Sequence, residues 1–171
     1  MHARPAWLTT VAVDLDGLEN AEFWKDYWDN GLVGTALYFI PHLLAMPDRA
    51  GRVLSALAHA PTGGVLFHCM GGRDRTGLIS LLLLTAVGVE TEEIVSDYME
   101  TVRLGDVRAA SANRNNAEPM LEQLCATRGT TTEGAFRDAI RQLDLTWFYT
   151  AANIDPHDIA AIQTWRGNIP R

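Results

Sequence analysis

The sequence predicts an α/β domain in which helices surround a small, mostly parallel central sheet. Two short stretches have strand character, residues 9–15 by alternation and residues 65–67 by a continuous apolar run. The second is followed by an almost wholly apolar stretch, residues 78–87, with the length of a buried helix. A strand followed by such a helix is a unit of layered α/β folds. We therefore expect one layer of strands between helices, and a helix-rich C-terminal half.

The first strand is predicted over residues 9–15, where alternate apolar side chains share one side, those of Val11, Val13 and Leu15. Asn20 is a residue type that caps helices, and the aromatic side chains of residues 21–29 recur at helical spacing. This spacing predicts a helix whose aromatic face packs on the core.

Two further helices should precede the second strand. The one that starts near Leu32 should break or kink at Pro41. Asp48 should cap the next, and the turn at residues 61–64 should end it. The apolar residues 65–67, bounded by glycines on one side, then have the character of a buried strand.

The second half of the chain should be mostly helical. A buried helix should run from Arg75 or Thr76 to Gly88, and a second should start at Thr91. Residues 104–116 are polar and predict a long connection. Three more helices are expected near residues 117–126, 132–143 and 156–165.

The size and net charge of the chain exclude some classes of function. The chain has 171 residues, 47% of them hydrophobic, so we expect a single domain over residues 1–171. The net charge of −7 argues against a nucleic-acid binder, which needs excess Lys and Arg to displace counterions. The longest apolar run is too short to cross a bilayer, so no stable membrane insertion is expected.

The cysteine content indicates a reducing compartment. Cys69 and Cys125 are too few for a disulfide framework, and a His directly before Cys69 indicates a reactive thiol. We expect a cytoplasmic protein without a signal peptide, and secretion by another route stays open. The remaining histidines are scattered and form no zinc-binding spacing with Cys125, so neither a metal nor another cofactor is expected.

The loop between the second strand and the buried helix carries the predicted chemistry. It reads His68-Cys69-Met70-Gly71-Gly72-Arg73-Asp74-Arg75-Thr76-Gly77. Such a turn can point backbone N–H groups inward as an anion-binding nest, to which the helix adds its positive end. We therefore predict a phosphate-binding loop, whose substrate-binding residues are His68, Met70, Gly71, Gly72, Arg73 and Thr76.

Cys69 and Arg75 are the predicted catalytic pair. Cleavage of a phosphate dianion needs an attacker that is already ionised, and the positive loop should lower the pKa of Cys69 below its ordinary value of about 8.5. Arg75 can return its planar guanidinium to the phosphate through two parallel hydrogen bonds. Thr76 should donate its hydroxyl to the sulfur, and His68 should orient the loop rather than transfer protons.

Other functions for this loop fit less well. Cys69 could be an inert core thiol, but the surrounding glycines, Arg75 and Thr76 fit one phosphate site. The chain has no Gly-Lys-Ser or Gly-Lys-Thr of a nucleotide-binding Walker A loop. Rhodanese-like sulfur transfer also uses a loop cysteine, but the spacing to Arg75 suits phosphate better. A catalytically weak or dead phosphate-binding module stays the main alternative.

The ten loop residues resemble the His-Cys-x-x-Gly-Lys-Asp-Arg-Thr-Gly loop of a bacterial protein-tyrosine-phosphatase family, which includes the secreted mycobacterial tyrosine phosphatase B. The resemblance continues through residues 76–102 and, more weakly, to the C-terminal helices. It implies a tyrosine-phosphatase-like fold and hydrolysis through a phosphocysteine intermediate. Phosphotyrosine is the first implied substrate, followed by phosphoserine, phosphothreonine and phosphoinositides. The implied partners are thus phosphoproteins or phospholipids, with phosphate or another oxyanion in the loop.

The resemblance also implies that Asp74, inside the loop, is the proton donor to the leaving group. Its structural alternative is an acceptor for loop N–H groups or an ion-pair partner of Arg73. Asp14, Asp16 and Asp48 are further candidates for the donor. The general acid is therefore open at this point.

Two features depart from the family. Arg73 stands where the family usually has Lys, which keeps the charge but not its shape. The strand that the family has before the region of Thr9 is missing, so the domain is expected to be truncated at its amino end. Either the start codon is misassigned, or the chain is a natural truncation that shields the open sheet edge in a homodimer.

Three arginines in or beside the polar connection are a last candidate feature: Arg103, Arg108 and Arg114. In the resembling fold this region borders the pocket, so they are predicted to attract an anionic substrate. The alternative is a solvated basic surface that balances nearby acids.

Overall fold

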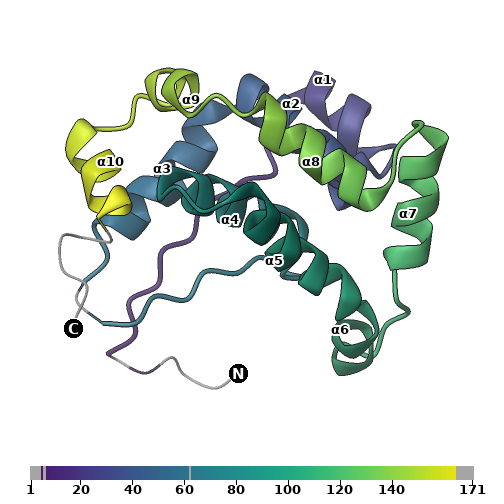
Figure 1. Cartoon of the computed structure of the whole chain (residues 1–171). Helices are drawn as coiled ribbons and strands as arrows, with labels where there is room; N and C mark the ends of the chain where they lie inside the picture. Colours follow the sequence, from purple (N-terminus) through teal and green to yellow (C-terminus); the bar gives the residue numbers. More distant parts are fainter. Residues whose placement is uncertain (1–4, 6, 62, 165–171) are drawn as a thin grey trace.

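The computed structural model describes residue 5, residues 7–61 and residues 63–164. Helices and their connections form all of this part (Figure 1). In chain order, the helices are α1 (Ala21–Phe23), the π-helix η1 (Trp24–Trp28), the 3-10 helices η2 (Leu32–Gly34) and η3 (Ala36–Tyr38), α2 (Phe39–Ala45), α3 (Pro47–Ala58), α4 (Asp74–Ala86), α5 (Thr91–Arg103), α6 (Gly105–Ser111), α7 (Glu118–Thr127), α8 (Thr132–Gln142), α9 (Leu145–Ala151) and α10 (Pro156–Gln163).

The helix α4 lies in the middle of the hydrophobic core. Leu78, Leu81 and Leu82 are fully buried, and they pack with residues of α2, α3 and α5. This confirms the buried helix that the apolar run predicted. The helix begins at Asp74, inside the predicted phosphate loop. The packing of α4 in the core therefore fixes the position of the C-terminal part of this loop.

A cluster of three aromatic rings fixes this end of α4 against the later helices. The rings of Tyr98 and Phe136 stack with centroids 4.0 Å apart, and Phe39 meets both edge-on. Gly77 lets α4 approach, because a Cβ there would stand 3.0 Å from the ring of Tyr98. The N-terminal end of α4, which follows the loop, is therefore packed closely against aromatic side chains of the core.

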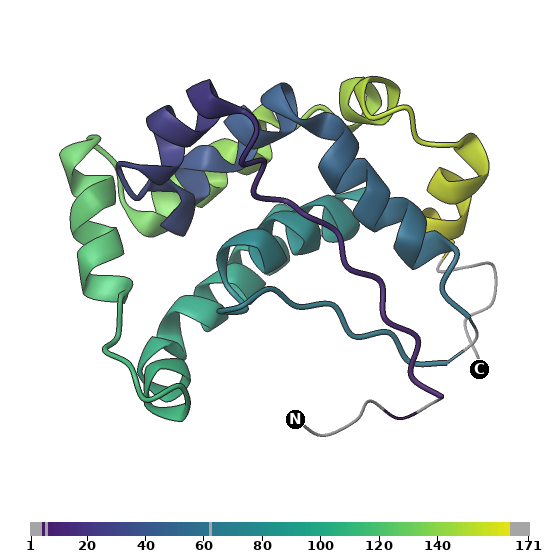
Figure 2. The same ribbon diagram turned by 180° about the vertical axis from the view of Figure 1, so that it is seen from behind.

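The predicted parallel sheet is not found among the described residues, which corrects this part of the fold prediction. Residues 9–15 and 65–67 instead run as extended chain below α4 (Figures 1 and 2). Val65 and Phe67 pack on the core while Leu66 is 87% exposed, so the alternation of a strand is present with one face buried. No backbone hydrogen bond joins the two segments. Alternation favours extended chain, but a sheet also needs a neighbour that completes the ladder.

Several local predictions can be compared with the helices. Asn20 caps α1 as predicted, because its side chain accepts from the Phe23 N–H at 3.0 Å. The break at Pro41 is wrong: Pro41 lies in the first turn of α2, where an N–H has no helical partner to lose. The predicted connection over residues 104–116 contains α6, because Ala and Arg favour helix even on a solvated surface.

The helices of the described residues are too short or too polar to cross a membrane, and none qualifies as a candidate span.

Candidate active site

The predicted loop, residues 68–77, follows the extended residues 64–67 and includes the first turn of α4. Gly72 has a φ of +67°, which a glycine adopts without strain. The side chain of Met70 is exposed, and Gly71 and Gly72 have open space around them. The loop is therefore accessible to a ligand from solvent.

Hydrogen bonds organise the loop around the sulfur of Cys69. The N–H of Gly72 donates to Sγ at 3.2 Å, and the N–H of Cys69 donates to Oγ1 of Thr76 at 3.0 Å. The exposed ring of His68 donates from Nδ1 to the carbonyl of Cys69 at 2.9 Å. The ring nitrogen must be the donor because a carbonyl can only accept. His68 thus contacts the loop backbone.

The environment of Cys69 favours its thiolate. Burial alone would raise the pKa of the thiol, but hydrogen bonds from the hydroxyl of Thr76 and from the N–H groups of Thr76, Arg73 and Gly72 lower the pKa to about 7. A large share of the thiol is then ionised at neutral pH. The loop provides this without a neighbouring base.

Arg75 stands in the first turn of α4 and is partly exposed. Its Nη1 donates to both carboxylate oxygens of Asp16, at 2.8 and 3.1 Å, and its side chain keeps 29% of its accessible surface. Its Nε and Nη2 have no hydrogen-bond partner within the described part of the chain. Two nitrogens on one edge of the guanidinium are therefore available for an anion.

Arg73 is placed quite differently, because its side chain is only 5% exposed. Its Nε donates to both oxygens of Glu118, at 2.8 and 3.0 Å, and its Nη1 donates to the carbonyl of Gly34. The guanidinium also lies over the ring of Tyr98, 5.5 Å from its centroid. This guanidinium therefore contacts the protein interior, and the N–H of Arg73 is its contribution beside the sulfur.

Glu118 ties the loop to the later helices. It accepts from Arg73 and from Nη2 of Arg108, and Nη1 of Arg108 reaches the carbonyl of Gly71 at 3.4 Å. The sequence analysis did not single out Glu118. It lies 45 residues from Arg73, and no local pattern distinguishes it from other acids of the chain.

The four candidate proton donors have different surroundings. Burial raises the pKa of Asp74, although the charges of Arg73 and Arg75 act in the opposite direction. Asp14 has a lowered pKa because it accepts from the N–H of Asp16 and from Arg49. Asp16 is paired with Arg75, and Asp48 pairs on the exposed surface of α3 with Arg52. Asp74 is thus the candidate with a raised pKa, and its Oδ1 also lies 3.5 Å from Nη1 of Arg73, as its alternative role of ion-pair partner requires.

In proteins, metal ions are held by characteristic arrangements of side chains. The residues that the structure describes contain no group of three or more His, Cys, Asp or Glu side chains arranged to hold an ion.

The loop thus presents a cysteine, backbone N–H groups and an arginine at a helix N-terminus, an arrangement that can bind an anion. The model of the tyrosine phosphatase family matches residues 36–165, and the chain belongs to this family.

Named relatives share short stretches with the chain. A tyrosine-protein phosphatase of Nostoc commune is 49% identical over 47 residues, 28% of this chain and 16% of that protein. The triple specificity protein phosphatase PtpB of Mycobacterium tuberculosis is 49% identical over 50 residues, 29% of this chain and 17% of that protein. The matched stretches thus span under a fifth of the length of either relative. No solved structure matches the chain.

Proposed function

We propose that the chain is a cysteine-dependent phosphatase that hydrolyses phosphate monoesters through a phosphocysteine intermediate. The observation that supports this most is the thiol of Cys69, whose pKa of about 7 leaves a nucleophile inside an anion-binding loop. The free edge of Arg75, formed by Nε and Nη2, is suited to two oxygens of the phosphate. A module that only bound phosphate would need the N–H groups and Arg75 but no ionised thiol.

The reaction proceeds in two displacements at phosphorus. The thiolate of Cys69 attacks the phosphorus while the bond to the ester oxygen breaks, and Asp74 gives its proton to that oxygen. A water molecule then attacks the phosphocysteine, and the S–P bond breaks to restore the thiolate. Asp74 takes up the proton of the water, and Thr76 donates its hydroxyl to the departing sulfur. Inorganic phosphate leaves the loop.

The replacement Cys69→Ser tests this mechanism. We expect turnover of para-nitrophenyl phosphate to fall below detection, because a serine hydroxyl is not ionised at neutral pH, while binding of inorganic phosphate survives. The matched control is Cys125→Ser, which makes the same change at the other cysteine of the chain, a buried one. Activity of Cys69→Ser within about tenfold of the wild type would overturn the nucleophile assignment. A wild type that binds phosphate without turnover would establish the binding module instead.

Phosphotyrosine is the substrate that we propose first. PtpB is named for triple specificity, and phosphoserine, phosphothreonine or phosphoinositides are the further substrates to test. The guanidinium of Arg73 is buried, so it adds no cation at the loop mouth for a multiply charged headgroup. We expect a panel of these substrates at equal concentration to give the highest kcat/KM for phosphotyrosine peptide. A higher value for a phosphoinositide would contradict this preference.

We also propose a homodimer through the two extended segments, residues 9–15 and 65–67. The carbonyls of Asp14 and Leu15 accept from Arg49 and His42, but the other backbone groups of the two segments form no hydrogen bonds to described backbone. Val11 and Leu66 are exposed beside them. Extended chain with unpaired N–H and C=O groups can pair with a second copy as a sheet edge does. Sedimentation at several concentrations should show a dimer that Leu66→Lys weakens. A monomer at all concentrations would exclude it.

A further inference from the structure

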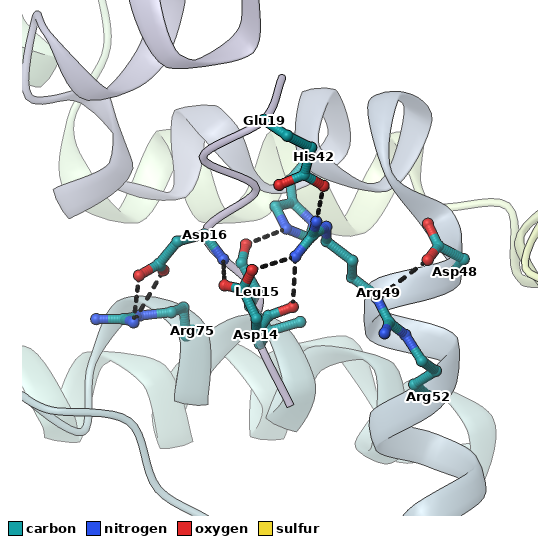
Figure 3. A network of polar contacts seen from close by, with 9 residues as sticks. All are labelled: Asp14, Leu15, Asp16, Glu19, His42, Asp48, Arg49, Arg52 and Arg75. Carbon is teal, nitrogen blue, oxygen red and sulfur yellow. Dashed lines mark hydrogen bonds and ion pairs between the residues drawn. The ribbon is translucent and has the colours of Figure 1, made fainter. Parts of the chain in front are cut away.

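The phosphate-binding candidate Arg75 is held from outside its own loop. Asp16, 59 residues earlier, accepts from Nη1 through both of its carboxylate oxygens (Figure 3). Each side chain retains 29% of its exposure, so the pair is shielded more than an ordinary surface ion pair. The contact uses the nitrogen on one side of the guanidinium and leaves the edge formed by Nε and Nη2 free.

The segment that carries Asp16 has no helix or strand, yet buried side chains hold its backbone. The ring of His42, from α2, is buried, and its Nε2 lies 2.8 Å from the carbonyl of Leu15. Burial lowers the pKa of His42, so the neutral ring donates this hydrogen bond. Within the segment, the N–H of Asp16 donates to Oδ1 of Asp14 at 2.8 Å.

A second anchor comes from α3. Nη1 of Arg49 donates to the carbonyl of Asp14 at 2.9 Å and to its Oδ2 at 2.6 Å, and Nη2 bonds Glu19. Figure 3 shows these contacts on one side of the segment and the contact to Arg75 on the other. Gly17 has a φ of +68°, which other residues rarely adopt, and a Cβ there would meet the side chain of Met46. The carboxylate of Asp16 is thus fixed from two helices.

We propose that Asp16 is a positioning residue, which orients Arg75 so that Nε and Nη2 face the phosphate oxygens. The inference rests on the proposed function and extends it to a residue outside the loop. An unpaired Arg side chain would sample several rotamers, and an ion pair to a fixed carboxylate removes that freedom before the substrate binds. Because Asp16 contacts the nitrogen away from the free edge, it leaves the two-point contact to phosphate open.

Two other roles for Asp16 are less consistent with this geometry. A competitor for the phosphate would occupy the edge formed by Nε and Nη2, but Asp16 contacts Nη1 alone. A general acid must offer an oxygen to the leaving group, whereas both carboxylate oxygens of Asp16 accept from Nη1 of Arg75. The three roles predict different changes when the charge is removed.

Asp16→Asn separates them, with Glu22→Gln as the control that removes an exposed charge in α1. First, phosphate and tungstate binding is measured by calorimetry in the Cys69→Ser background, where no turnover occurs. We expect Asp16→Asn to weaken binding about tenfold and Glu22→Gln to leave it unchanged. Second, kcat/KM should fall by a similar factor for phosphotyrosine and for para-nitrophenyl phosphate. The melting temperature of Asp16→Asn should stay within about 2 °C of the wild type.

A double-mutant cycle shows whether Asp16 acts through Arg75. In the Arg75→Lys background, Asp16→Asn should have less than about a twofold further effect, because the group that it orients is gone. Unchanged or tighter phosphate binding in Asp16→Asn would overturn the inference, and tighter binding would assign a competitor. A larger loss for phosphotyrosine than for para-nitrophenyl phosphate would assign a proton donor instead. If no variant binds phosphate, the proposed function fails together with the inference.

Discussion

Arg73 and Arg75 lie two residues apart in one loop, but the fold uses them in opposite ways. The side chain of Arg73 is 5% exposed and bonds Glu118, Gly34 and the face of Tyr98. The side chain of Arg75 is 29% exposed and has one partner, Asp16. The guanidinium of Arg73 thus contacts other protein groups, whereas the guanidinium of Arg75 has an edge without a protein partner.

The difference shows that charge and position in the predicted phosphate loop do not by themselves identify the arginine that is available to a ligand. Burying a guanidinium is costly unless partners are supplied, and the partners at Nε and Nη1 of Arg73 compete with any substrate. A partly exposed guanidinium that is held on one side by a protein carboxylate can bind an anion through the nitrogens of its other side without breaking a hydrogen bond. Arg73 also has a nitrogen without a partner, Nη2, but this nitrogen is buried, whereas Arg75 is partly exposed. Exposure of the free donors, rather than proximity to Cys69, therefore distinguishes the two arginines.

The strongest test of the comparison is the same conservative change at both positions. Arg75→Lys should lower kcat/KM at least about 1000-fold, because Lys keeps the charge but loses the two-point contact. Arg73→Lys should lower the melting temperature by several degrees, because a buried pair is disrupted, and lower kcat/KM less than about tenfold. Both are measured with para-nitrophenyl phosphate and by thermal unfolding. The reverse pattern would show that Arg73 contacts the substrate.

Asp74 lies between the two arginines, and its role can be read from leaving groups. Asp74→Asn should slow phosphotyrosine hydrolysis about 100-fold, because phenolate leaves poorly without a proton. It should slow para-nitrophenyl phosphate much less, since that leaving group needs little protonation. Burial raises the pKa of Asp74, which extends the pH range in which it holds a proton. Equal slowing of the two substrates, measured as kcat, would indicate that Asp74 only organises the loop.

The contrast also explains what the sequence could predict. The loop with Cys69, Arg75 and Thr76 is local, so spacing and residue type were enough to find it, and the apolar run predicted the buried α4. The partners that distinguish the two arginines are distant. Glu118 lies 45 residues from Arg73 and Asp16 lies 59 residues from Arg75. Asp16 was singled out only as another proton donor. The prediction of a sheet was wrong for a similar reason, because the pairing of strands also depends on residues that are distant in the sequence.

Thr76 allows the electrostatic contribution of the loop to be measured apart from the arginines. Its hydroxyl helps to lower the pKa of Cys69 to about 7, so Thr76→Val should raise that pKa. The thiolate forms as pH rises through the pKa, so kcat/KM at pH 6 should fall about tenfold for each unit of the increase. At pH 9 the difference should shrink, and Thr76→Ser should behave like the wild type. A loss that is the same at both pH values would exclude this role.

The smallest effect is expected from the arginines outside the loop. Arg103 pairs with Glu100 on the exposed end of α5, and Arg108 bonds Glu118 and Gly71. The triple Ala replacement of Arg103, Arg108 and Arg114 would therefore combine steering with damage to the support of Arg73. Arg103→Ala with Arg114→Ala leaves that support intact and isolates steering.

In a chain of net charge −7, local positive charge raises the rate at which an anionic substrate meets the loop. The double variant should lose about threefold in kcat/KM for a multiply phosphorylated peptide at low salt, with kcat unchanged. Added salt should erase this difference, because exposed charges are screened within about 10 Å at 0.1 M. Arg108→Ala should instead lose activity at every salt concentration, since it removes a bond to Glu118 inside the protein. If both variants respond to salt alike, Arg108 belongs with the steering residues, and the support of the loop rests on Glu118 and Arg73 alone.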